Sequence, residues 1–188
     1  MKKTAILSIL MGLAISTVVI QSCKKNDKPA VVTKPTLYDS LGSTTMVTDP
    51  KNSSAKIEQG YLTIRSVVDS TIFVIAGDNN INKYFNVLLM EVHAGNTTGF
   101  TMLSKNLSDF IAVGTGAKHF TYGGDDMVAA HDPAKNTRMN GKAMNDDFTS
   151  FEMDLVKGAG QNGIMPDNPA LKSLAAIVES LRTQVVQN

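Results

Sequence analysis

The chain has 188 residues, with 18 Lys and Arg, 17 Asp and Glu, and a formal net charge of +1. This balance provides no basic excess of the kind that binds nucleic acid, so we expect no nucleic-acid partner. Hydrophobic residues make up 43% and aromatic residues 6%, which suits an ordinary globular protein. The single cysteine excludes a disulfide framework and a cysteine-based metal site.

The start of the chain has the pattern of a secretory signal. Two lysines precede an uncharged apolar run from Ala5 to Ile20, and a small residue precedes Cys23. The ending VIQSC resembles the lipobox of bacterial lipoprotein signals, although Gln21 fits it imperfectly. The resemblance implies that residues 1–22 are a cleaved signal peptide and that Cys23 carries lipid. The alternative is an uncleaved membrane anchor, because the run is nearly long enough to span a bilayer.

Residues 23–35 form the next segment, which is polar, contains proline and is poor in large apolar residues. Such a composition is typical of a flexible tether. We therefore expect a lipoprotein of the bacterial cell envelope, held on a membrane through Cys23. Residues 36–188, about 150 residues, are enough for one domain with one core.

Five or six helices, and hence an all-α domain, are predicted by the spacing of apolar residues beyond the tether. Between Ile57 and Ile75 such residues recur every three or four positions, as on one face of a helix. The β-branched residues of this segment also suit a strand, but the length of the run favours a helix. Residues 43–55 are polar and predict a loop with a turn at Asp49-Pro50. Further helices are expected at residues 81–92, 100–113, 127–131, 145–158 and 168–185.

The sequence TYGGDDMVAAHDP, residues 121–133, predicts a single helical turn. Two glycines break the backbone, two aspartates suit a helix start, and Pro133 ends the helix. Met127 and His131 are four residues apart and share a face. One imidazole on an apolar face suits the iron of a five-coordinate haem. A lone histidine in this setting is more often a partly buried residue with an ordinary partner.

Taken in chain order, these features resemble a group I truncated haemoglobin. The resemblance is strongest in the spacing of Tyr122, Gly124, Met127 and His131. It implies a two-over-two helical sandwich that binds haem b, with loop insertions at about residues 43–56 and 86–102. The segments that carry it are LYDSLG at 37–42, IRSVVDSTIFVIAGDNNINKYF at 64–85, NLSDFIAVGTGAKHFTYGGDDMVAAH at 106–131, and MNDDFTSF at 144–151.

By position, the resemblance makes His131 the proximal iron ligand and places Tyr122 at the haem edge, near a propionate. The other expected haem contacts are apolar, and each is also explained as an ordinary core residue. They are Phe85 after the second helix, Leu103, Leu107, Phe110 and Ile111 on the distal helix, and Met127 and Phe148 on the proximal and inner walls.

The distal side departs from the family pattern. Ile72 stands where many members have a tyrosine that hydrogen-bonds bound oxygen, and Thr71 and Phe73 flank it. Leu103 and Leu107 stand where polar residues often occur. Because an apolar pocket donates no hydrogen bond to bound O2, we expect weaker oxygen retention than in polar-pocket members, unless Thr71 reaches in.

The expected function is binding of O2, NO or CO at the haem iron. Redox chemistry between bound oxygen and nitric oxide is an extension that rests on the fold alone. His93, in the second insertion, is an alternative sixth ligand of a bis-histidine electron-transfer protein, although a surface histidine is the simpler interpretation. A haem-free globin-like binding module is the third alternative. The sequence names no redox partner, and the spacing of its histidines matches no zinc motif.

Overall fold

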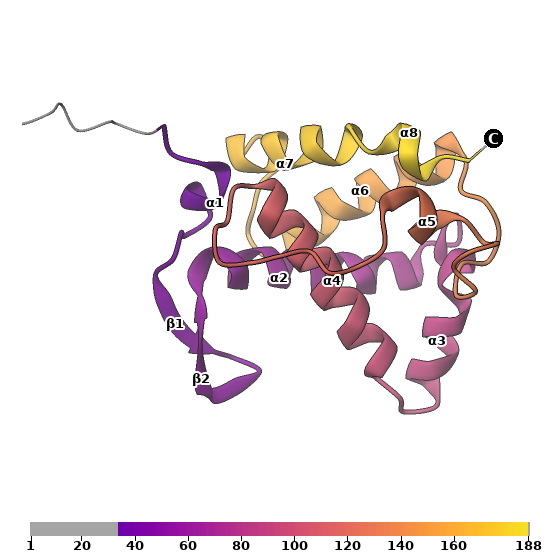
Figure 1. Ribbon diagram of the computed structural model, residues 1–188, viewed down its shortest axis with the longest axis horizontal. Helices are drawn as coiled ribbons and strands as arrows, with labels where there is room; N and C mark the ends of the chain where they lie inside the picture. Colours follow the sequence, from indigo (N-terminus) through magenta and orange to yellow (C-terminus); the bar gives the residue numbers. More distant parts are fainter. Residues whose placement is uncertain (1–33, 188) are drawn as a thin grey trace, which may run out of the picture. The chain divides into compact units, whose positions relative to one another are not determined.

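The computed structural model describes residues 34–187, so the predicted signal peptide, Cys23 and most of the tether lie outside the described residues. Within them, helices dominate, as the apolar spacing predicts (Figure 1). The elements in chain order are α1 (Leu37–Ser40), β1 (Met46–Asp49), β2 (Asn52–Glu58), α2 (Gln59–Gly77), the 3-10 helix η1 (Asn82–Phe85), α3 (Asn86–His93), α4 (Thr98–Gly114), α5 (Met127–His131), α6 (Asn145–Gln161), α7 (Pro169–Glu179) and α8 (Arg182–Val185).

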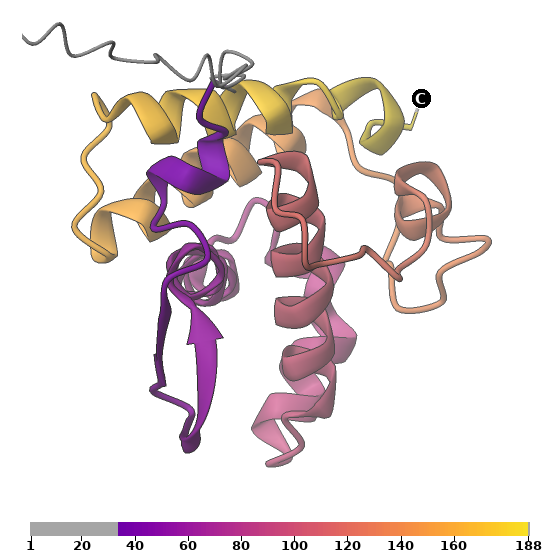
Figure 2. The same ribbon diagram turned by 60° about the vertical axis from the view of Figure 1, so that its left-hand side comes forward.

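Helix α2 is the central element, because it packs against both α4 and α6. Its buried residues recur every three or four positions from Gly60 to Ile75, which confirms the predicted helix face. In Figure 1, α4 crosses α2, while α6 and α7 form a second layer along the top. Figure 2 looks nearly along α2 and shows the same two layers. The core therefore lies between two pairs of helices.

A glycine sets the distance between the two layers. A Cβ atom at Gly158 of α6 would lie only 2.4 Å from Thr71 Oγ1 and 2.7 Å from the Thr71 backbone nitrogen. Only a residue without a side chain permits this approach. The sequence analysis predicts this helix at residues 145–158, and α6 continues for three more residues, to Gln161. Gly158 is thus a packing residue rather than a stop signal.

The first insertion forms a β-hairpin, and the prediction of a loop at residues 43–55 was wrong. Strands β1 and β2 pair antiparallel, with Val47 opposite Ile57, and the predicted turn at Asp49-Pro50 joins them. Arg65 of α2 binds Asp49 with two hydrogen bonds of 2.6 and 3.1 Å. The strands are mostly exposed and polar, so their pairing and this anchor to α2 stabilise them, and neither is visible in composition.

The second insertion is also structured. The helix predicted at residues 81–92 is confirmed as η1 and α3, and α4 begins two residues earlier than expected, at Thr98. Only a short connection at residues 94–97 remains irregular, so most of the insertion at about residues 86–102 is helical. The connection is short because the two helices it joins pack against each other.

The last helix begins as predicted but is interrupted. The Asn168 side chain accepts a hydrogen bond from the Ala170 backbone nitrogen at 2.8 Å, and Pro169 is the first helical residue. The predicted single helix to residue 185 is divided, because α7 ends at Glu179 and α8 begins at Arg182. Among residues 34–187, no helix combines the length and apolar character that crossing a membrane requires.

Two serines one turn apart on the buried face of α4 provide a test of how α4 packs against α2. Ser104 Oγ donates to Asp69 Oδ1 at 2.5 Å, whereas buried Ser108 Oγ has no hydrogen-bond partner among the described residues. A buried unpaired hydroxyl costs about 1–3 kcal/mol. We expect Ser104→Ala to lower the free energy of unfolding by about 1–2 kcal/mol and Ser108→Ala to leave it unchanged or slightly raised. Urea denaturation measures both, and equal losses would contradict the unpaired state of Ser108.

Candidate functional site

Helix α5 presents His131 as its last residue. The Asp126 side chain caps the helix by accepting a hydrogen bond from the Ala129 backbone nitrogen at 3.0 Å. Pro133 follows two residues beyond the end, in a turn. The predicted short helix, with its aspartate start and its stop after the histidine, is confirmed.

The ring of His131 is held in one tautomer. Its Nδ1 atom lies 2.8 Å from the Met127 carbonyl oxygen. Because a carbonyl oxygen only accepts, Nδ1 carries the proton and the Nε2 atom of the neutral ring keeps its lone pair. Burial lowers the pKa of His131 below its ordinary value of 6.5, while the hydrogen bond to Met127 acts in the opposite direction. A neutral imidazole oriented in this way is a competent metal ligand.

Tyr122 connects α4 with the turn that precedes α5. Its hydroxyl donates to the Asp125 carbonyl oxygen at 2.6 Å. Its ring meets the ring of Phe110 edge to face, with centroids 5.3 Å apart and an interplanar angle of 82°. Since the hydroxyl is engaged with the backbone, the contacts of Tyr122 in this structure brace the approach to His131.

The predicted distal residues divide into two groups. Leu103, Leu107 and Phe110 are only partly buried, as expected for residues along an apolar wall. Ile111 is 3% exposed and belongs to the core. The structure therefore separates Ile111 from the half-buried residues of the same helix.

The remaining predicted contacts lie at more than one place. Phe85 is partly buried and packs against Ile75, Ile81 and Tyr84. Phe148 is buried, and the Arg182 guanidinium carbon lies 4.5 Å from the centre of its ring. His93 is exposed at the end of α3. Core packing is sufficient to explain Phe148. His93 lies at the surface, which is the simpler of its two interpretations.

Thr71 does not supply the hydrogen-bond donor that the predicted distal side lacks. It is fully buried against α6, and its hydroxyl donates to the Val67 carbonyl oxygen at 2.8 Å. Ile72 is buried, and Phe73 is 65% exposed beside Phe100, with ring centroids 5.3 Å apart. The single proton of Thr71 is therefore engaged within α2, which leaves no free hydroxyl donor at these three positions.

His119, three residues before Tyr122, lies near α1 rather than near α5. His119 Nδ1 is 2.7 Å from Glu58 Oε1, and the Tyr38 hydroxyl donates to Glu58 Oε2 at 2.7 Å. Hydrogen bonds from Thr36 have the largest effect in lowering the pKa of the Asp39 carboxyl, and the charge of Lys118 lowers it further. Within residues 34–187, no three His, Cys, Asp or Glu side chains gather as a metal site would require.

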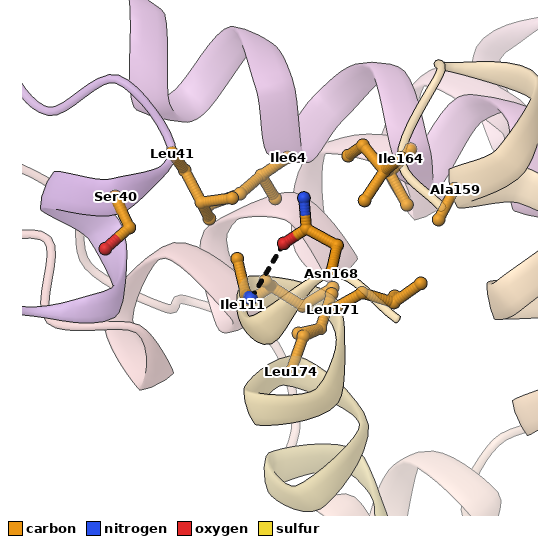
Figure 3. A pocket seen from close by; sticks show the side chains of 11 residues that line it. Ser40, Leu41, Ile64, Ile111, Ala159, Ile164, Asn168, Leu171 and Leu174 are labelled. Atoms are coloured by element: carbon orange, nitrogen blue, oxygen red, sulfur yellow. Dashed lines mark hydrogen bonds between the residues drawn. The ribbon is translucent and has the colours of Figure 1, made fainter. Parts of the chain in front are cut away.

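An apolar cavity of about 180 Å³, which no sequence pattern predicts, lies between α2, α4, α6 and α7. Figure 3 shows side chains of Leu41, Ile64 and Leu171 around it, with Asn168 among them. Ile111 is the one predicted haem contact in its lining. Leu103, Leu107 and Phe110, the other predicted haem contacts on α4, do not line this cavity. Periodicity identifies its residues as core but does not reveal that they leave a gap.

Comparison with known proteins defines the fold. No protein-family profile and no curated protein matches the sequence. Among solved structures, the chain is similar to a tyrosine-to-phenylalanine variant of the truncated haemoglobin of Tetrahymena pyriformis in its Fe(III) form, with a TM-score of 0.54 over 82% of this chain and 100% of that chain. The chain has the truncated-haemoglobin fold. The two sequences are 16% identical, so the similarity is one of fold, and it confirms the predicted class.

The residues that the sequence analysis assigns to the haem suit the group chemically. His131 offers one neutral nitrogen with a free lone pair. The partly buried side chains of Leu103, Leu107 and Phe110 offer an apolar surface on α4. One nitrogen donor and an apolar wall are what a five-coordinate haem requires.

Stability should depend on pH through His131. Because its pKa is lowered in the native state, the unfolded chain binds more protons between that native pKa and 6.5. The free energy of unfolding of the haem-free chain is therefore expected to rise with pH across the range just below 6.5. This component should disappear in His131→Leu. Urea denaturation at several pH values measures it, and an identical pH dependence in both proteins would contradict the assignment.

Two adjacent glycines test the brace formed by Tyr122. A Cβ atom at Gly124 would lie 2.5 Å from the Tyr122 hydroxyl oxygen, whereas one at Gly123 would meet nothing within 4 Å. We expect Gly124→Ala to displace the tyrosine and to lower the free energy of unfolding by about 1–3 kcal/mol. Gly123→Ala should change it by less than about 0.5 kcal/mol. Near-ultraviolet circular dichroism with denaturation distinguishes them, and matching losses would show that Tyr122 is not the cause.

Proposed function

We propose that this domain binds haem b through His131 Nε2 and takes up O2, NO or CO on the opposite side of the iron. The observation that carries the proposal is the hydrogen bond of 2.8 Å from His131 Nδ1 to the Met127 carbonyl, which leaves Nε2 unprotonated on a partly buried helix. The truncated-haemoglobin fold supports it, because α4 and α5 are the helices between which the resemblance places the haem.

Each part of the site has a separate task. The Met127 carbonyl orients the imidazole, and burial keeps it neutral near pH 7. Leu103, Leu107 and Phe110 exclude water from the distal side of α4. Bound haem supplies an iron with one open coordination position for a diatomic ligand.

The distal chemistry favours weak retention of oxygen. Thr71 donates its proton within α2, and Ile72 and Phe73 have no polar side-chain atoms. Without a donor near the outer oxygen atom, bound O2 is less stabilised than in a polar pocket, whereas CO depends less on such a bond. Gas binding, sensing or scavenging therefore fits better than tight oxygen storage.

The location that we propose is the bacterial cell envelope. The signal-like start and the VIQSC ending support a lipid-anchored chain with its gas-binding domain outside the cytoplasm. Reaction of bound oxygen with nitric oxide would fit such a position but is an analogy based on fold. The redox partner that such a reaction requires is unidentified.

The absorption spectrum of the full-length chain with added haem tests the proposal. The parent should show a strong Soret band, which His131→Ala should weaken and shift because the iron loses its nitrogen ligand. His119→Ala is the matched control, since His119 binds Glu58 rather than lying on α5, and it should resemble the parent.

Two other results would favour the alternatives. A six-coordinate low-spin parent that becomes five-coordinate in His93→Ala would indicate a bis-histidine electron-transfer protein. A folded parent without a Soret band would contradict haem binding and leave a globin-like binding module.

A further inference from the structure

The helix that carries His131 is too short to be stable by itself. Helix α5 has five residues, and nucleation makes isolated helices of this length unfavourable in water. The last four carbonyl groups of any helix also lack partners within it. The position of His131 must therefore be fixed by groups that satisfy these carbonyls from outside the helix.

Two carbonyl groups of α5 have partners within the same segment. Met127 O receives the hydrogen bond from the His131 ring at 2.8 Å. Ala129 O accepts from the Asp132 backbone nitrogen at 3.3 Å. Among the last four carbonyls of the helix, those of Val128 and Ala130 receive side-chain amides from beyond it.

Asn136 binds the carbonyl next to the histidine. Its Nδ2 atom donates to Ala130 O at 2.7 Å. Its backbone nitrogen donates to Asp132 O at 2.8 Å, and its Oδ1 accepts from the Arg138 backbone nitrogen at 3.0 Å. Both ends of the amide are therefore engaged, so the side chain has one orientation.

The loop that carries Asn136 is itself fastened to α3. Arg138 forms two hydrogen bonds of 2.6 and 2.8 Å with the Glu91 carboxylate. Bidentate pairs of this kind fix geometry as well as adding energy. The end of α5 is thereby connected to a separate helix of the domain.

Gln187 binds α5 from the far end of the chain. Its Nε2 atom donates to Val128 O at 3.2 Å, and its backbone nitrogen donates to Ala143 O at 3.0 Å. Helix α8, which ends two residues earlier, packs against α5, as Figure 1 shows. The C-terminal segment thus reaches back to the histidine helix.

We propose that Asn136 and Gln187 are positioning residues that form a two-point clamp on α5 and hold His131 in the orientation that haem ligation needs. The inference rests on the proposed function, because it assigns the clamp to a haem ligand. It assigns a role to the C-terminal segment that the sequence pattern did not indicate.

Hydrogen exchange in the haem-free full-length chain tests the clamp by itself. Asn136→Asp removes the NH2 donor at constant size, and Asn140→Asp is the matched control in the same loop, where the amide donates to Lys83 O instead. We expect the α5 backbone amides to exchange about fivefold faster in Asn136→Asp, the equivalent of one hydrogen bond, and to be unchanged in the control. Gln187→Glu, with Gln184→Glu as its control, should behave in the same way.

The rate of haem loss then tests whether the clamp holds His131 for haem ligation. Haem transfer from the loaded chain to an excess of an acceptor protein should be about fivefold faster in Asn136→Asp and Gln187→Glu than in their controls. A parent that holds haem, with clamp variants that match their controls in exchange and transfer, would overturn the clamp alone. A parent without a Soret band would overturn the proposed function, and the exchange rates would still report whether the clamp exists.

Discussion

The contact between α2 and α6 is the constraint on which the rest of this domain depends. At Gly158 the two helices approach so closely that a methyl group would overlap Thr71. At this contact the Thr71 hydroxyl donates to the Val67 carbonyl of its own helix. The residue at which the two helical layers meet therefore has no free hydroxyl proton, and under the proposed function it provides no donor to a bound ligand.

The position of α4 on α2 follows from buried polar contacts rather than from apolar packing alone. The Tyr61 hydroxyl donates to Asp109 Oδ1 at 2.7 Å, and Lys105 pairs with the other carboxylate oxygen. Ser104 adds its bond to Asp69. Such directional bonds fix the rotation of a helix more precisely than apolar contact does. They turn the polar side of α4 toward α2 and leave Leu103 and Leu107 partly exposed.

Much of the candidate site was predictable because its signals are local. The two glycines, the aspartate cap and Pro133 define α5, and the four-residue spacing places Met127 beside His131. The sequence could not show that the Met127 carbonyl selects the ring tautomer, or that Phe148 lies under Arg182. These contacts depend on side-chain directions and on helices distant in the chain. The hairpin was missed for a similar reason, since Arg65 anchors a segment whose own composition is that of a loop.

The sequence by itself determined the helical class, the short histidine helix and the apolar positions of α4, because apolar spacing and capping residues act within a few residues of each other. Only the tertiary structure decided how α5 is held. Asn136 is five residues from His131, but three complete helices separate Gln187 from Val128 in the chain, and Gln187 reaches it only after the chain has folded back. A five-residue helix gains most of its stability from such partners. Nearby residues therefore predict that the helix forms, whereas distant residues determine where it lies.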